Sequence, residues 1–159
     1  LAYVNSTGQS TYGSTVNSAT ADLAGELFQL PAGALGLAVG IEHREVKGQE
    51  VPGQFEQSGY STDLAGNATY GRYTVREAYL EANVPLLKGV PFADLLSLNA
   101  ATRYSDYSNF GSTTNSKFSF MWKPVRDVLT RGTYAEGFRS PTLGDTFGGG
   151  SQTFASYLD

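Results

Sequence analysis

Apolar and polar residues alternate along several stretches of this chain. The clearest stretch is residues 35–46, where an apolar row alternates with small or charged residues. That row is Leu35, Leu37, Val39 and Ile41. Because successive side chains of a β-strand point to opposite faces, the pattern predicts a strand with one apolar and one polar face. We expect further strands at residues 21–30, 72–86, 95–107, 115–124 and 127–139.

The connections between these strands alternate in length. Short turns are expected at residues 31–33, where proline and glycine supply turn conformations, and at residues 87–92 and 125–126. Long polar loops are expected at residues 1–20 and 47–71 and after Arg139, with residues 1–4 ending a strand and 108–114 forming an intermediate loop. The sequence therefore predicts an all-β fold, an antiparallel up-and-down meander of about six long strands.

Two features favour a membrane β-barrel over a soluble sheet. The expected strands are longer than the usual five or six residues, and aromatic residues stand near their ends. The polar rows also carry Arg103, Lys117 and Arg131 in mid-strand. Composition agrees, because only 16% of the residues are charged, below the average for soluble proteins. The longest apolar run, residues 34–41, is too short for a transmembrane helix.

Charge and residue content exclude several kinds of chemistry. A net charge of −4 argues against nucleic acid as a partner, because no basic patch is available to meet phosphates. The chain has no cysteine and one histidine, His43, which excludes zinc–thiolate sites and leaves no complete catalytic triad. We expect no metal site and no cofactor, and we place His43 at the level of the lipid headgroups.

Four blocks of residues stand in order between Gly25 and Phe147. They read GELFQLPAGALGLAVGIEHR, REAYLEANVPLL, LNAATRYSDYSNFGSTT and RGTYAEGFRSPTLGDTF. Together they resemble the barrel domain of TonB-dependent outer-membrane receptors. The family more often has alanine where Ser140 stands in the last block.

The resemblance implies a barrel of about 22 strands with an amino-terminal plug and a TonB box. It implies a location in the Gram-negative outer membrane and the import of a scarce ligand, such as a ferric siderophore, a vitamin or a glycan. The implied partners are outer-membrane lipid, the plug, TonB and a small molecule that the sequence does not identify. We expect residues 1–159 to be part of the barrel alone, without plug, TonB box or final strand, and thus a fragment of a longer protein.

Charged residues of neighbouring polar rows are expected to meet across the turn at residues 87–92. A tight turn there places Glu77 opposite Arg103 and Glu81 opposite Asn99, where opposite charges add a fraction of a kcal/mol per pair. Extending the register through the next hairpins brings Arg131 into the same layer. We predict a lumen-facing group that contacts the plug, consisting of Glu77, Glu81, Arg103 and Arg131. The alternative is a set of solvated charges that neutralise one another.

Other candidates concern chemistry, lipid and ligand. Glu77 and Glu81 lie on one strand with no cleft evident, so we expect no catalytic carboxylate pair and no enzyme. An aromatic girdle at the membrane interfaces is expected from Tyr104, Tyr107, Trp122 and Tyr134. Because loops carry binding more often than scaffolds do, we expect ligand contacts from Tyr60, Tyr70 and Arg72.

Two other functions share part of this pattern. A passive outer-membrane porin has the same strands without a plug, and a soluble β-sandwich that binds a ligand has similar alternation. The apolar rows discriminate between membrane and sandwich. They should be exposed on one continuous face if they meet lipid, and buried together if they meet a second sheet.

Overall fold

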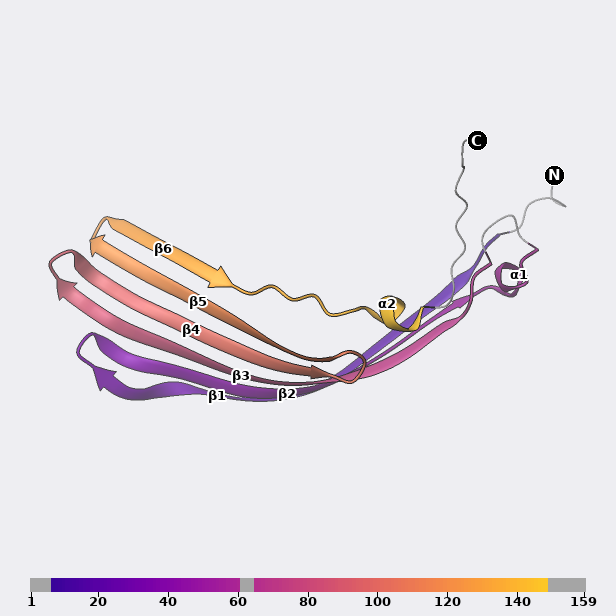
Figure 1. Cartoon of the computed structure of the whole chain (residues 1–159), viewed down its shortest axis with the longest axis horizontal. Coiled ribbons are helices and arrows are strands. Elements are labelled where there is room, and N and C mark those ends of the chain that lie inside the picture. The colour runs from indigo at the N-terminus through magenta and orange to yellow at the C-terminus, as the bar shows by residue number, and fades with distance from the viewer. Residues whose placement is uncertain (1–6, 61–64, 149–159) are drawn as a thin grey trace, which may run out of the picture. The chain divides into compact units, whose positions relative to one another are not determined.

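The computed structural model describes residues 7–60 and 65–148 of the chain. In this part, six antiparallel strands form one sheet in which each strand pairs with its neighbour in the sequence (Figure 1). The prediction of an all-β up-and-down meander is therefore confirmed. Neither of the helices in the described residues is long and apolar enough to span a membrane.

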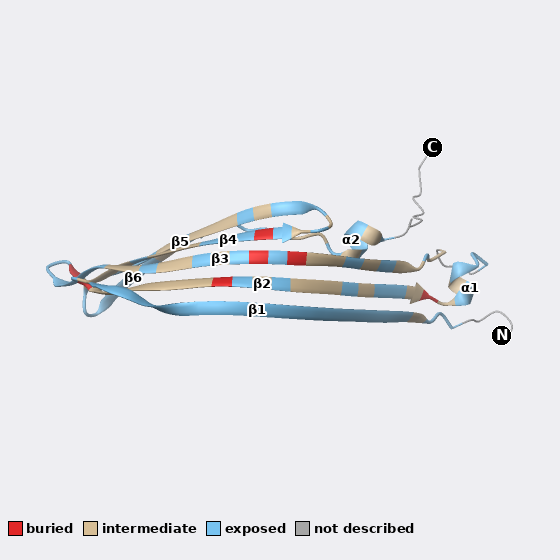
Figure 2. Ribbon diagram, turned by 90° about the horizontal axis from the view of Figure 1, so that it is seen from below, coloured by how far each residue is buried: buried red, intermediate tan, exposed pale blue. Residues whose placement is uncertain are grey.

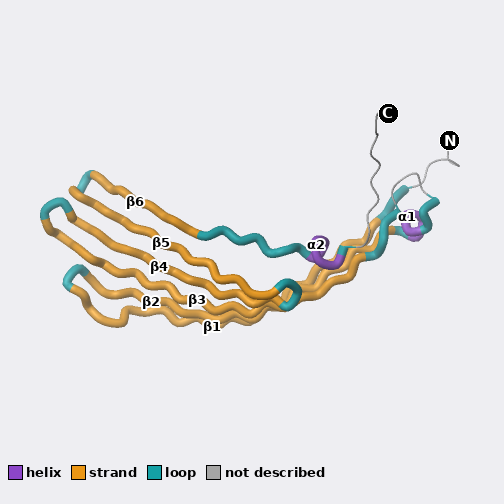
Figure 3. Tube along the Cα trace, in the orientation of Figure 1, coloured by secondary structure: helices purple, strands orange, loops and turns teal. Residues whose placement is uncertain are grey.

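The strands are far longer than those of ordinary soluble sheets (Figure 3). Those nearest the amino terminus have 21, 20 and 22 residues. The strands are β1 (Ser10–Leu30), β2 (Gly33–Pro52), β3 (Thr69–Val90), β4 (Ala93–Tyr107), β5 (Gly111–Val125) and β6 (Val128–Ala135). Two short helices are α1 (Gln54–Gln57) and α2 (Leu143–Phe147).

Three two-residue turns, at residues 31–32, 91–92 and 126–127, join the hairpins β1–β2, β3–β4 and β5–β6. Phe92 adopts a φ of 60° in the second turn, a conformation that a bulky side chain rarely accepts. The β4–β5 connection is also tight, spanning residues 108–110, and Gly111 follows it with a φ of 105°. Only the connection between β2 and β3 is long in the described part of the chain, and it contains α1.

Several predicted loops are wrong because the strands continue through them. Residues 10–20 belong to β1, residues 47–52 and 69–71 to β2 and β3, residues 87–90 to β3, and residues 111–114 to β5. In most of these extensions both faces are polar, so the apolar alternation disappears while the backbone pairing persists. The strand predicted at residues 127–139 ends at Ala135. Residues 1–4, predicted to end a strand, lie outside the described residues.

The chain divides into two compact units, and every contact given below lies within one of them. The turn unit comprises Ser18–Arg44 and Thr74–Arg139 and holds the two-residue turns. The loop unit comprises Leu1–Asn17, Glu45–Tyr73 and Ser140–Asp159, and holds both short helices.

Within the turn unit the side chains alternate between two faces. We call one side the polar face. It carries Glu42 and Arg44 of β2 and Glu77 of β3, and Arg44 contacts both carboxylates. By alternation and register it also carries the odd-numbered residues of β4, β5 and β6. We call the other side the apolar face; it carries Ile41, Leu80 and Phe118.

The apolar face is not covered by a second sheet. Ile41 is 62% exposed and Phe118 is 57% exposed. The few buried residues of the described chain lie on β2, β3 and β4 and at the turn at residues 31–32 (Figure 2). A soluble β-sandwich would bury the apolar rows together, so this exposure contradicts that alternative.

Candidate functional site

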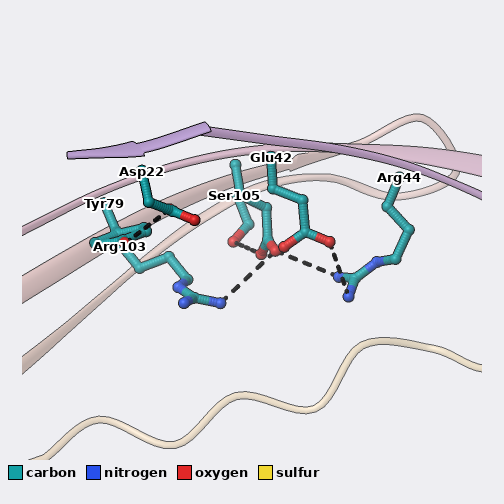
Figure 4. Close-up of polar contacts among 7 residues, drawn as sticks. Asp22, Glu42, Arg44, Tyr79, Arg103 and Ser105 are labelled. Atoms are coloured by element: carbon teal, nitrogen blue, oxygen red, sulfur yellow. Dashed lines mark hydrogen bonds and ion pairs between the residues drawn. The ribbon is translucent and has the colours of Figure 1, made fainter. Parts of the chain in front are cut away.

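Glu77 is the centre of an ionic network on the polar face of the turn unit. Its side chain is only 6% exposed and accepts a hydrogen bond of 2.5 Å from the Ser105 hydroxyl. Arg44 lies 3.3 Å from the carboxylate on one side, and Arg103 lies 3.7 Å away on the other (Figure 4). A buried carboxylate is costly unless it is paired, and these partners from β2 and β4 satisfy that requirement.

The network extends to β1 through Tyr79. The Tyr79 hydroxyl donates a hydrogen bond of 2.8 Å to Asp22, and the guanidinium carbon of Arg103 lies 5.6 Å from the centre of the Tyr79 ring. Gly40 of β2 makes this possible, because a Cβ there would overlap both the Tyr79 ring and the Asp22 carboxylate. The ring therefore occupies the space that glycine leaves free.

A second carboxylate continues the polar face towards β5. Asn99 donates a hydrogen bond of 2.8 Å to Glu81, and the Lys117 ammonium lies 3.8 Å from the same carboxylate. Both side chains of the ion pair are partly exposed, at 43% and 42%. Polar contacts therefore run across the sheet from β1 to β5. They pass through two carboxylates, the buried Glu77 and the more exposed Glu81.

The structure corrects the predicted register by two residues. Glu77 stands opposite Ser105, and Glu81 stands opposite Ala101. Glu77 and Arg103 share the polar face as expected, but they meet diagonally rather than directly. The cause is that β3 continues to Val90 through an irregularity between Pro85 and Leu87, so the hairpin turns later than predicted.

Arg131 does not join this layer. It stands opposite Met121, which stands opposite Ser97, six residues along β4 from Arg103. At about 3.3 Å per residue this is about 20 Å along the strand. The expectation that Arg131 lies in the layer of the other predicted charges is therefore wrong, although Arg131 does belong to the polar face.

The predicted aromatic girdle is divided between the two faces. Tyr104, Trp122 and Tyr134 lie on the apolar face by register. The Trp122 indole N–H donates a hydrogen bond of 2.9 Å to the carbonyl oxygen of Phe92, which anchors its ring at the two-residue turn. Phe92 itself is an exposed aromatic that sequence reasoning missed.

Tyr107 belongs to the polar face and packs in a small aromatic cluster. Its ring centre lies 4.4 Å from that of Phe110 and 6.0 Å from that of Phe138. Val75, opposite Tyr107 in the register, is fully buried. The cluster fixes the end of the β4–β5 hairpin and the segment after β6, so Tyr107 cannot share one lipid-facing band with Tyr104.

The residues predicted to contact ligand lie in the loop unit. Tyr60 follows α1 and is 87% exposed. Arg72 lies 3.3 Å from the Glu45 carboxylate, which also pairs with Lys47 at 2.9 Å. By strand alternation Tyr70 and Arg72 lie on the side opposite Gly71. Two of the three candidates, Tyr70 and Arg72, therefore flank Gly71, and both line the groove described next.

An open groove in the loop unit was not foreseen from the sequence. Its volume is about 650 Å³, and its lining comes from Gly13, Ser14, Thr15, Lys47, Gly48, Gln49, Tyr70, Gly71, Arg72 and Phe147. Leu143 and Phe147 of α2 pack over Gly48 and Gly71, where an added Cβ would overlap them. The short helix thus rests on the polar side of β2 and β3, and its Phe147 forms part of the groove. The sequence signal for this docking is the pair Gly48 and Gly71, which face two apolar residues four positions apart in α2, Leu143 and Phe147.

Glu77, Glu81 and His43 do not form a metal-binding group in the described part of the chain. No group of three or more His, Asp or Glu side chains is placed to hold a metal ion within residues 7–60 and 65–148. His43 lies in β2 on the apolar side, away from the carboxylates of the polar face. Glu77 and Glu81 are engaged with Arg, Ser, Asn and Lys partners.

Long antiparallel strands, tight turns, one exposed apolar face and one charged face define a segment of a membrane β-barrel wall. The chain belongs to the TonB dependent receptor-like β-barrel family, whose model matches residues 2–158. No curated protein and no solved structure matched the chain. Membership places the protein in the Gram-negative outer membrane, among transporters rather than enzymes.

Proposed function

We propose that this protein imports a scarce ligand across the outer membrane with energy delivered by TonB, the ligand being a ferric siderophore, a vitamin or a glycan. The observation that carries the proposal is the family match over residues 2–158. The sheet is consistent with it, because its polar face bears an ordered ionic network around Glu77.

In this proposal the polar face lines the barrel lumen and contacts an amino-terminal plug. Glu77 and Arg103 offer the ordered part of that surface, since both are held by neighbours. Glu81 is more exposed and offers an acceptor. Arg131 stands on β6 as a separate cationic contact, about 20 Å along the strands from Arg103.

The ends of the strands would face opposite compartments. Outer-membrane barrels have short periplasmic turns and longer external loops, so the end with the two-residue turns is assigned to the periplasm. The groove is open within the loop unit, and its lining comes mainly from β1, β2 and β3. Ligand contact is assigned to this groove, whose lining includes Tyr70 and Arg72, and to Tyr60.

The test is uptake in cells that express the complete reading frame. Accumulation of radiolabelled ferric siderophores, cobalamin and maltodextrins would be measured in a strain with the gene, without the gene, and with the gene but without TonB. Saturable uptake of one ligand that disappears with either deletion is the expected result. Uptake that persists without TonB would identify a passive porin instead.

A further inference from the structure

The groove of the loop unit continues into a second, smaller one. The larger groove has a volume of about 650 Å³, and the smaller one has a volume of about 330 Å³. Residues of α2 line both grooves, and the two share Gly13, Ser14, Gly48 and Gln49. Together they form one elongated trough along β1 and β2, with α2 as a wall.

Strand alternation shows which side chains enter this trough. An added Cβ at Gly13 would meet the Gln49 side chain, so these two residues share one side of the β1–β2 pair. Their neighbours in each strand point to the other side, which is the side where Leu143 of α2 packs over Gly48. The polar and aromatic strand residues that line the trough on this α2 side are Tyr12, Ser14, Glu50 and Thr69.

The charge of the trough argues against an anionic ligand. Lys47 and Arg72 contribute to the lining, but their charged ends pair with Glu45 at 2.9 Å and 3.3 Å, and Glu45 lines neither groove. Each of these cations is next to a glycine that faces α2, so alternation turns its side chain to the opposite side. Among the described residues that line the trough, Glu50 is the one ionic side chain on the α2 side.

The remaining groups suit a sugar chain. Tyr12 is 71% exposed in the smaller groove, and Phe147 lines the larger one. A sugar ring has an apolar face of C–H groups, against which an aromatic ring packs, and a rim of hydroxyl groups. The Glu50 carboxylate accepts hydrogen bonds from such hydroxyls, and Ser14 and Thr69 both donate and accept. An elongated trough also fits a linear chain better than a compact ferric complex.

We propose that this trough binds a short, neutral oligosaccharide. Tyr12 is its stacking platform, and Glu50 is the acceptor for its hydroxyl groups. Apolar contacts that supply area, together with a few placed polar groups that fix orientation, are the usual pattern of a small-molecule site. The inference rests on the proposed function, since it specifies the class of ligand that the protein would import.

Binding of maltotriose, cellotriose and xylotriose would be measured by isothermal titration calorimetry on the receptor expressed from its complete reading frame. The detergent is lauryldimethylamine oxide, because glycoside detergents would themselves offer sugar to the trough. Trigalacturonic acid is the matched anionic probe. We expect at least one neutral trisaccharide to bind, and the acid to bind about tenfold more weakly, because it meets a carboxylate. Equal or tighter binding of the acid would overturn the proposal, and so would the absence of binding by all three neutral sugars.

Variants of the trough test the assigned roles. Tyr12→Ala should weaken binding of the neutral sugar about tenfold, whereas Tyr12→Phe should retain most of the affinity, because the ring remains. Glu50→Gln should weaken binding about threefold, because a charged acceptor makes the stronger hydrogen bond. The matched control is Tyr134→Ala, which removes a tyrosine that is 67% exposed and lines neither groove. Equal losses in Tyr12→Ala and Tyr134→Ala would overturn the proposal.

Two results separate this inference from the proposed function. TonB-dependent uptake of a ferric siderophore, without binding of any of the three neutral sugars, would overturn the inference alone. Binding of a neutral sugar whose uptake persists without TonB would support the inference and overturn TonB-dependent import.

Discussion

At the scale of single residues, Gly40 decides where the Tyr79 ring lies. The ring fills the space above this glycine, and from there its hydroxyl reaches Asp22 across β2. We expect Gly40→Val to lower the free energy of unfolding by about 1–3 kcal/mol, because the added side chain overpacks a filled site. The measurement is urea-induced unfolding of the complete receptor in lipid vesicles.

The matched control for Gly40→Val is Gly25→Val. Gly25 lies in β1 with no atom within 4 Å of an added Cβ. The control should unfold near the wild-type urea concentration. A further variant, Gly40→Val with Tyr79→Ala, should recover part of the loss because the ring no longer competes for the space. Equal destabilisation by the two valine variants would contradict the proposed packing.

Glu77 and Glu81 differ in burial, and this difference predicts unequal costs of neutralisation. Glu77→Gln leaves Arg44 and Arg103 beside an uncharged amide at a buried position. Because both arginines are partly solvated, we expect a loss of about 1–2 kcal/mol rather than the full cost of a deeply buried pair. Glu81→Gln should cost less than about 1 kcal/mol, since the side chains of its ion pair are still 43% and 42% exposed. Equal losses in urea-induced unfolding would show that Glu77 is not the centre of the network.

At the scale of elements, α2 is held by two apolar side chains on two glycines. Gly71→Val places a side chain where Phe147 and Leu143 now pack. We expect it to release α2 and to speed amide hydrogen exchange at residues 143–147 at least several-fold, since those amides lose a protected docked state. Gly137→Val is the control, because nothing lies within 4 Å of its added Cβ. Unchanged exchange in Gly71→Val would refute this docking.

The alternation of residues predicted the central part of each strand but not its ends. Leu35 to Ile41 identified β2 because one face was apolar, and a one-residue slip there would reverse both faces. Residues 10–20 gave no such signal, since Ser, Thr and Asn occupy both faces of β1 beyond the apolar rows. Strand length in that region depends on pairing with a neighbour, which a single-segment pattern does not contain.

The sequence predicted which face of the sheet carries each residue of the candidate site, but it did not predict the register between the strands. Glu77 and Arg103 share a face because the strand period is two. Their offset depends on the irregularity between Pro85 and Leu87 and on the exact turn at residues 91–92. The contact of Tyr79 with Asp22 joins residues 57 positions apart through the gap at Gly40, and no local pattern encodes it.

At the scale of the whole molecule, the sheet has two edges and one uncovered apolar face. β1 and β6 each have one neighbour in the described sheet, which leaves a row of backbone groups open on either side. Open edges pair readily with other chains, and a closed barrel abolishes them. The family match explains how the protein avoids this hazard, because further strands of a barrel would complete both edges.

This geometry predicts how residues 1–159 behave when they are expressed alone. With two open edges and side chains such as Ile41 and Phe118 more than half exposed, the chain should require detergent and associate through its edges. Size-exclusion chromatography with light scattering should show oligomers in detergent and precipitation without it. Prolines placed at outward-facing amide positions of β1 and β6 should reduce association in detergent, because they remove ladder donors. A monodisperse monomer in plain buffer would contradict both the exposed apolar face and the open edges.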